Sequence, residues 1–331
     1  MDGSFFEHWP LLQGSEIEVP RPFLSPQKAL LNALDSPLLS TFPGPIVGWV
    51  APRVLPFFKR AAQALSEAGF EVRWTTHPWA LPALGEVVKV TDPGQKSSCG
   101  LGRFGREAFL PKTLLEGATV LLVDQIKPHA LLGFSGGPAT LLEAMGDCWQ
   151  AAFEQGEVLA RLKPGRLRGN PLAAEAVDWC AWQSARGKIF ALNVMAFGSS
   201  QAWLSGHPLS TLKRALALAP QKGAEPLSAL AVRSQAVSLE ELAIDGLRWA
   251  ALLPPGGRLG LWAPLLRPEA PSLDHWWQKV WAQGTASLEV GLWGAALSGA
   301  GSFATPESLA LWLDEAQPKV ACEGWLTDDL R

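Results

Sequence analysis

The sequence predicts an α/β protein made of two domains, each with a parallel-type sheet flanked by helices. Short runs rich in β-branched and aromatic residues alternate along most of the chain with longer segments whose apolar residues recur at helical spacing. Glycine and proline clusters separate these segments. Strands that alternate with helices form parallel sheets with helices on both faces, and 331 residues suffice for one or two such domains.

The first βαβ unit follows a leader that is punctuated by proline up to about Phe42. Residues 44–51 (GPIVGWVA) have the composition of an inner strand. Residues 54–69 carry apolar side chains at helical spacing and end at Gly69, a common helix terminator. Residues 71–76 (EVRWTT) then return to strand character, which completes the unit.

The rest of the N-terminal half continues the alternation. We expect further strands at 86–92, 118–126 and 188–197, and helices at 138–162 and 171–186. The last helix has a clear start, because an Asn side chain caps the first helical amides and proline fits the first helical position; the pair here is Asn170-Pro171.

A domain boundary is predicted in the segment 218–228, which mixes proline, glycine and charge without periodicity. The N-terminal domain then covers residues 1–220 and the C-terminal domain residues 221–331. The second domain alternates again, with strands expected at 229–234, 258–266, 287–295 and 319–325 and helices expected to begin at Ser238, Ser272 and Thr305.

Composition excludes several classes of partner. Lys and Arg total 28 against 31 Asp and Glu, so the chain has no excess of positive charge for a nucleic acid backbone or an anionic membrane. No apolar run approaches the ~18 residues of a membrane span, and residues 1–4 lack the basic residues of a signal peptide. We therefore expect a cytoplasmic protein that binds a small-molecule substrate or an anion, with its oligomeric state left open.

Two of the five histidines, His77 and His129, follow predicted strands. Ligands of open α/β sheets bind at the carboxyl ends of strands, so this placement favours a functional role. A loop or core histidine with satisfied hydrogen bonds is the alternative for each. The cysteines form no CxxC or CxH pattern, which argues against a structural zinc site or a disulfide framework.

Two glycine-rich segments stand out. The loop Ser135-Gly136-Gly137 opens a predicted helix, so its amides could hold an anion at the helix N-terminus; a plain tight turn explains it equally well. Residues 100–105 (GLGRFG) match the dinucleotide-binding pattern GxGxxG, but we expect a loop before them where that pattern needs a strand. We therefore expect no nicotinamide dinucleotide there.

Taken in order, the motifs resemble the nickel-dependent lactate racemase family. The runs LGRFGREAFLPKTLLEGATVLLVDQIKPHALLGFSGGP, LRGNPLAAEAVDW and FALNVMAFGSSQAWLSGHP match the family's I-x-P-H, G-F-S-G-G, G-N-P and Asn-Val segments. The resemblance covers roughly residues 44–208 well and the C-terminal half weakly. It implies a two-domain α/β isomerase whose interdomain cleft holds a nickel-pincer nucleotide, and in which hydride passes between the cofactor and a 2-hydroxy acid.

The resemblance also implies roles for individual residues. His129, in I-K-P-H, matches one of the two catalytic histidines that alternate as general base and acid, and His77, in T-T-H-P, looks like the other. Arg53 looks like the arginine that binds the substrate carboxylate. The loop Ser135-Gly136-Gly137 corresponds to the cofactor-binding loop.

Three departures from the family concern the cofactor and the substrate. Ala139 stands where the family has the lysine that bonds covalently to the cofactor, and Gln155 is the nearest equivalent of a nickel-binding histidine. Residues 239–257 contain neither the Gln nor the Lys that the family offers to the substrate.

Two main hypotheses follow from these departures. In the first, a racemase- or epimerase-type hydride shuttle on a 2-hydroxy acid persists with a non-covalently held cofactor. In the second, the chain is a non-enzymatic or inactive paralogue that binds an anion or a nucleotide in the interdomain cleft. A third and weaker one is self-association or partner binding through the tryptophans at 276, 277 and 281, for which core packing is the alternative.

Overall fold

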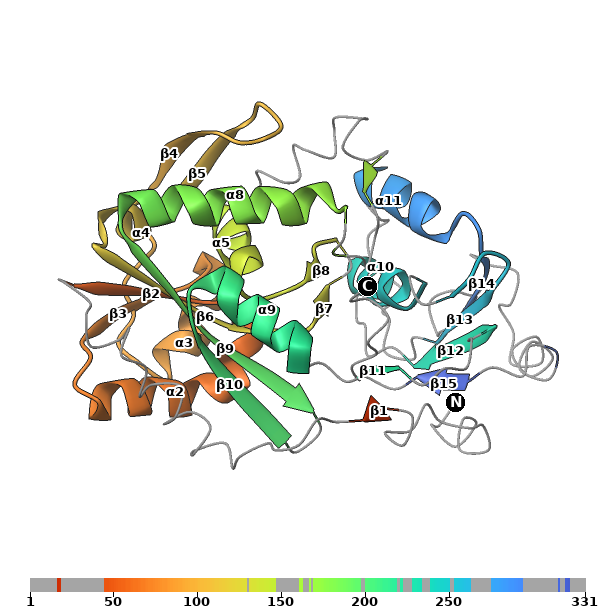
Figure 1. Cartoon of the computed structure of the whole chain (residues 1–331), viewed down its shortest axis with the longest axis horizontal. Helices are drawn as coiled ribbons and strands as arrows, with labels where there is room; N and C mark the ends of the chain where they lie inside the picture. Colours follow the sequence, from red (N-terminus) through yellow and green to blue (C-terminus); the bar gives the residue numbers. More distant parts are fainter. Residues whose placement is uncertain are drawn as a thin grey trace.

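A computed structural model describes residues 17–18, 45–129, 131–146, 161–162, 167, 169–197, 200–218, 221–222, 228–233, 239–250, 253–262, 275–293, 315 and 319–321. It contains a five-stranded sheet in the N-terminal half and a four-stranded sheet in the C-terminal half, both flanked by helices (Figure 1). The α/β fold class predicted from the sequence is therefore confirmed. The 220/221 domain boundary stays a prediction.

The N-terminal sheet has the strand order β10-β9-β6-β2-β3. Its strands are β2 (Ile46–Val50), β3 (Val72–Thr75), β6 (Thr119–Gln125), β9 (Lys188–Phe197) and β10 (Ser200–Gly206). All neighbours are parallel except the antiparallel edge pair β9–β10. The chain runs from β2 to β3 on one side and then to β6 on the other, so the topological switch point lies between β2 and β6.

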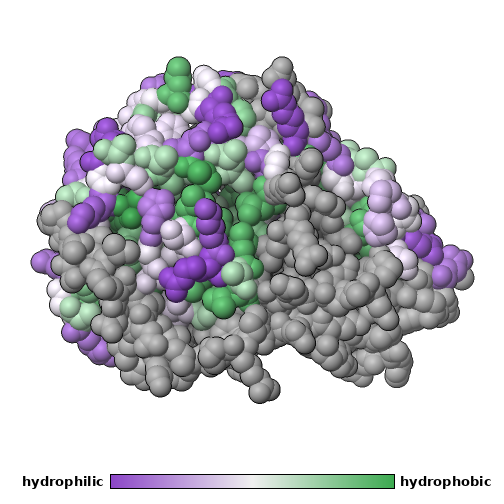
Figure 2. All heavy atoms as spheres, in the orientation of Figure 1, coloured by the Kyte–Doolittle hydropathy of each residue, from purple (hydrophilic) through white to green (hydrophobic). Residues whose placement is uncertain are grey.

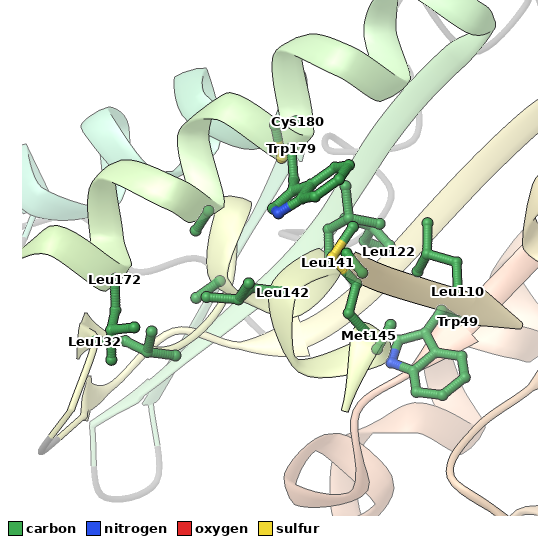
Figure 3. Packing of buried hydrophobic residues seen from close by; sticks show 14 of the residues in the cluster. Trp49, Leu110, Leu122, Leu132, Leu141, Leu142, Met145, Leu172, Trp179 and Cys180 are labelled. Carbon is green, nitrogen blue, oxygen red and sulfur yellow. The ribbon is translucent and has the colours of Figure 1, made fainter. Parts of the chain in front are cut away.

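Helices cover both faces of this sheet. Figure 1 shows α2 (Leu55–Glu67) on one side and α5 (Pro138–Met145) with α8 (Pro171–Arg186) on the other. Alternation along β2 explains the arrangement, because Val47 and Trp49 join the apolar cluster under α5 and α8 while Ile46 and Val50 join the cluster under α2. Figure 3 shows Trp49 beside Met145 within the first of these clusters.

Shorter elements complete the N-terminal half. They are a 3-10 turn at Pro52–Val54, a second at Pro78–Ala80, α3 (Leu81–Gly85), the hairpin strands β4 (Lys96–Leu101) and β5 (Glu107–Pro111), α4 (Lys112–Glu116), the hairpin strands β7 (Pro128–His129) and β8 (Gly133–Phe134), and α9 (Pro208–Leu218). Strand β1 (Ile17–Glu18) pairs with β11 (Gln221–Lys222).

The C-terminal sheet has the order β14-β13-β12-β15 and is parallel throughout. Its elements are β12 (Ala229–Arg233), α10 (Leu239–Ala250), β13 (Arg258–Trp262), α11 (His275–Thr285), β14 (Glu289–Trp293) and β15 (Lys319–Ala321). The helix expected from Thr305 lies outside the described residues.

The two halves share a continuous apolar core. Ala243 and Leu247 of α10 and Val280 of α11 belong to the same buried cluster as Leu131 and Leu132 of the N-terminal half. Figure 1 shows α10 next to the β7–β8 hairpin. The turn that follows His129 is therefore packed against the C-terminal half.

One predicted strand of the N-terminal half needs correction. The strand expected at 86–92 is instead a series of turns after α3, in which only Val90 forms a bridge, to Trp74. The amides of Val87 and Val88 bond back to the carbonyl of Leu84, and both valines pack against the α2 side of the core. Their apolar character reflects this packing against the core, and it produces a sequence pattern similar to that of a strand.

No helix among the described residues has both the length and the apolarity to span a bilayer. On the face drawn in Figure 2, hydrophilic side chains are spread over the described part of the surface around a band of hydrophobic residues.

Candidate functional site

A cluster of charged side chains lies at the switch point of the N-terminal sheet. Arg53 follows β2, Asp124 lies near the carboxyl end of β6, and Glu143 lies on α5, which faces that end. Open α/β sheets place their ligands at this position. The fold therefore brings Arg53, one of the residues singled out in the sequence, to a typical ligand-binding edge.

The guanidinium of Arg53 forms ion pairs with two carboxylates. Its Nη2 lies 2.6 Å from Oδ2 of Asp124 and 2.7 Å from Oε2 of Glu143. Asp124 is fully buried and also accepts hydrogen bonds from the Thr140 hydroxyl (2.6 Å) and the Gln125 amide (2.6 Å). Asp124 is thus held from three directions, whereas Glu143 is held mainly through Arg53.

The charges within this cluster balance. Burial alone would lower the pKa of Arg53, but Asp124 and Glu143 outweigh it and the guanidinium keeps its proton. Burial raises the pKa of Glu143 above its ordinary value; Arg53 opposes this rise and Asp124 adds to it. Whether Glu143 is ionised or protonated, the three groups together carry no net positive charge.

His129 faces this cluster with its ring nitrogen Nε2. Its Nδ1 accepts hydrogen bonds from the amides of Leu131 and Leu132, both at 3.2 Å. A neutral imidazole with an accepting Nδ1 carries its hydrogen on Nε2, and Nε2 lies 4.0 Å from Oε1 of Glu143. The hydrogen-bond network therefore assigns His129 an Nε2–H that is directed toward Glu143.

The imidazole of His129 stays neutral at physiological pH. Burial lowers its pKa to about 3, and the positive charges of Arg53 and Lys127 add to this effect. In this arrangement His129 Nε2 carries a hydrogen, and Nδ1 accepts from the two amides. The acid–base role that the family resemblance implies would require a proton acceptor at Nε2, and it stays a prediction.

Asn170 fixes the turn that holds His129. Its side-chain oxygen caps α8 by accepting from the amides of Leu172 (3.0 Å) and Ala173 (3.4 Å). Its side-chain nitrogen donates to the carbonyl of Leu131 at 2.6 Å. The sequence predicted the cap, which is confirmed, but not the second bond that ties the helix start to the histidine turn.

His77 lies at the same edge of the sheet, just after β3. Its ring packs edge-on against Trp49 of the adjacent strand, with ring centroids 5.0 Å apart. The preceding Thr76 donates its hydroxyl to the carbonyl of Val50 at 2.6 Å, which ties the ends of β3 and β2 together. The catalytic role predicted for His77 is not tested by this contact.

The loop Ser135-Gly136-Gly137 is buried. The Ser135 hydroxyl lies 2.8 Å from the carbonyl of Gln125 and 3.1 Å from that of Lys127, and its amide donates to the Lys127 carbonyl at 2.9 Å. These bonds connect the loop to the end of β6 and the residues that follow it.

The two glycines of the loop are required by their backbone. Gly136 and Gly137 have φ of 79° and 55°, and a Cβ at Gly136 would lie 2.4 Å from Cγ1 of Ile126. A tight turn therefore accounts for all the contacts seen. The predicted role in cofactor or anion binding stays a prediction.

The residues described do not fit a covalently held nickel-pincer nucleotide. Ala139, in the first turn of α5, is 5% exposed and packs into the core with a methyl group where the family has an amine. Figure 3 shows its helix neighbours Leu141 and Leu142 in the same cluster. In the described part of the chain no three His, Cys, Asp or Glu side chains gather as metal ligands. Gln155 lies outside it.

Buried polar atoms without partners concentrate near this edge. Within the described residues, five such side-chain atoms are found, and four of them are Trp49 Nε1, Arg53 Nε, Thr75 Oγ1 and Glu143 Oε1. Trp49 and Thr75 are paired neighbours on β2 and β3, close to their carboxyl ends. An unsatisfied buried group costs about 1–3 kcal/mol, so their concentration marks this edge as a candidate site.

Three other features are separate from this edge. The segment 102–105 is the turn of the antiparallel β4–β5 hairpin. A strand does precede it, contrary to the expectation of a loop, but the next element is a second strand and not a helix. This arrangement excludes a dinucleotide-binding βα turn. A cavity of about 580 Å³ lies between α2, β3 and residues 87–89. Trp281 packs against α10, where a Cβ at Gly246 would lie 2.5 Å from its ring.

Sequence reasoning missed Asp124, Thr140 and Glu143. A signal was present, because Asp124 is the charged residue in the otherwise apolar strand TVLLVDQ and Glu143 the charged residue in the otherwise apolar helix PATLLEAM. Charges in segments that are buried on all sides occur as pairs or with other compensation. Together with Arg53, they indicate a buried ion cluster.

Comparison with known proteins supports the fold. No family model matches the sequence, and no curated protein matches it. The structure is similar to the lactate racemase apoprotein from Thermoanaerobacterium thermosaccharolyticum, with a TM-score of 0.64 and 15% identity over 96% of this chain and 95% of that one. It is also similar to a structural-genomics protein from Thermotoga maritima, with a TM-score of 0.62 and 13% identity over 91% and 97%. The chain thus has a lactate-racemase-like fold along almost its whole length.

Proposed function

We propose that this chain is a non-catalytic, small-molecule-binding protein built on the lactate racemase fold. The observation that carries the proposal is the state of Arg53, whose Nη2 contacts both Asp124 and Glu143. An arginine recognises a substrate carboxylate through its positive charge and its planar set of N–H donors. Here Asp124 and Glu143 compensate the charge of Arg53, so the guanidinium adds no net positive charge for a 2-hydroxy acid.

The same edge keeps features of a binding site. It lies at the switch point of the sheet, and the side chains of Arg53, His129 and Glu143 are 19%, 15% and 11% exposed. Arg53 Nε and Glu143 Oε1 are buried and have no hydrogen-bond partner among the described residues, so this edge holds one donor and one acceptor that the protein leaves unsatisfied.

The cofactor is the main point on which this proposal departs from the racemases. Hydride transfer to and from a pincer nucleotide needs that nucleotide to be retained, and Ala139 offers no amine to anchor it. His129, as placed here, carries its hydrogen on Nε2 and has a lowered pKa, which does not favour proton abstraction from a hydroxyl.

The second candidate is a racemase- or epimerase-type isomerase that holds its cofactor non-covalently. Its support is positional, since Arg53, His77 and His129 all follow strands at one edge of a lactate-racemase-like sheet. In that candidate, His77 and His129 would exchange protons with the substrate hydroxyl.

A racemisation assay separates the two candidates. The protein is co-expressed with the enzymes that make the pincer nucleotide, and L-lactate is followed by chiral chromatography beside the single variants His77→Ala and His129→Ala. Our proposal expects no D-lactate above the level of the variants. Turnover by the wild type that either substitution abolishes would establish the isomerase instead.

A further inference from the structure

Arg53 would be an anion-binding side chain if it stood alone. A guanidinium at the carboxyl edge of a parallel sheet is positioned to meet a carboxylate or a phosphate, because it combines a permanent charge with a planar set of donors. Arg53 Nε is buried and makes no hydrogen bond within the described residues. Its donor capacity is thus only partly used, although its charge is fully compensated.

The two carboxylates that compensate Arg53 differ in how firmly they are held. Asp124 is fully buried and accepts hydrogen bonds from Thr140 and from the Gln125 amide, so it is an integral part of the sheet edge. Glu143 contacts Arg53 through Oε2, while Oε1 has no hydrogen-bond partner among the described residues and lies 4.0 Å from His129 Nε2. Glu143 is also the more exposed of the two.

We propose that Glu143 is a built-in carboxylate that occupies the anion-binding position of Arg53 and thereby makes the site selective against carboxylate ligands. A carboxylate brought to Arg53 would have to displace Glu143 from Nη2, and it would meet the carboxyl groups of Asp124 and Glu143 at contact distance from that nitrogen. The inference rests on the proposed function, because it names the class of ligand that this site excludes.

The test removes the charge of Glu143 and looks for the appearance of an anion site. Binding of acetate and L-lactate is measured by isothermal titration calorimetry on the wild type, Glu143→Ala and the near-isosteric Glu143→Gln. Glu116→Ala on the exposed end of α4 is the matched control. Circular dichroism checks that each variant is folded. If Glu143→Ala is not folded, Glu143→Gln still provides the test.

We expect at least about a tenfold gain in affinity for L-lactate in Glu143→Ala, a smaller gain in Glu143→Gln and none in Glu116→Ala. The gain should disappear in the double variant Arg53→Gln/Glu143→Ala. Folded Glu143 variants without any gain would overturn the inference, as would a wild type that binds L-lactate through Arg53. The last result would leave small-molecule binding intact, whereas racemisation by the wild type would overturn the proposed function.

Discussion

Replacing Arg53 by methionine tests the buried ion cluster directly. The substitution keeps much of the aliphatic stem and removes the cation that Asp124 and Glu143 share. Asp124 is fully buried, and its remaining donors are the neutral groups of Thr140 and the Gln125 amide. Removal of one partner of a buried ion pair leaves an uncompensated charge and costs about 3–5 kcal/mol. A Coulomb estimate for charges about 4 Å apart at an effective dielectric constant of 20 gives a similar value, about 4 kcal/mol.

Urea unfolding followed by tryptophan fluorescence measures this loss, and the chain provides a matched control. Arg103 contacts Asp178 at 2.7 Å, nearly the same distance, but the two side chains are 48% and 53% exposed. An exposed pair contributes at most about 1 kcal/mol, so Arg103→Met should have little effect.

A double-mutant cycle then locates the interaction. Glu143→Gln removes one of the two negative charges, so we expect Arg53→Met to be less damaging in that background, with a coupling energy of about 1–3 kcal/mol. If Arg53→Met costs no more than Arg103→Met, the reasoning about a buried, internally neutralised arginine is refuted.

Three further predictions concern stability. The pKa of His129 is about 3 in the folded chain against an ordinary 6.5, so folding disfavours protonation of this histidine and stability is lost as the pH falls from 6.5 toward 3. In urea titrations at pH 7 and pH 4.5, the wild type should therefore lose about 3 kcal/mol more than His129→Gln. Equal losses would contradict the assignment. Gly136→Ala should lower the free energy of unfolding by more than about 2 kcal/mol, because φ is 79° and a Cβ would meet Ile126 at 2.4 Å. The control Gly69→Ala, with φ of 83° and open space around the Cβ, should cost only about 1 kcal/mol. Similar unfolding midpoints for the two variants would be inconsistent with this account. Asn170→Ala should lower the free energy of unfolding, measured in urea, by about 2–3 kcal/mol, since it removes the α8 cap and the hydrogen bond to Leu131. Asn170→Ser should recover only the contribution of the cap. Full recovery by serine would show that the hydrogen bond to Leu131 contributes nothing.

Periodicity predicted the central elements of the fold. The strands β2, β3, β6 and β9 and the helices α2 and α8 all lie within or close to the segments expected from the sequence. These elements are buried on a continuous face, and burial is what generates the apolar pattern. The residues at 86–92 show the limit of that signal, because Val87 and Val88 cover the core from a turn.

Elements that the sequence did not predict have weaker patterns. The hairpin strand β4 (KSSCGL) has no buried residue, so it carries no apolar alternation. Strand β10 is an edge strand that follows β9 directly and pairs with it antiparallel, beginning with Ser200 opposite Phe197.

The candidate site could be predicted only in part. His77 and His129 could be identified because each follows a predicted strand, and Arg53 because its segment resembles one of the lactate racemase family. The pairing of Arg53 with Asp124 and Glu143 joins residues that are far apart in sequence. Only the three-dimensional arrangement therefore shows that the charge of this arginine is compensated.

The measurement that tests the central claim most directly is the nickel content of the purified protein after co-expression with the pincer-nucleotide pathway. Elemental analysis is paired with native and denaturing mass spectrometry. A chain in which Ala139 replaces the anchoring lysine and Arg53 is compensated internally should contain no nickel and keep its unmodified mass in both conditions. Stoichiometric nickel with an adduct that is lost on denaturation would show a non-covalently held cofactor and would contradict the account.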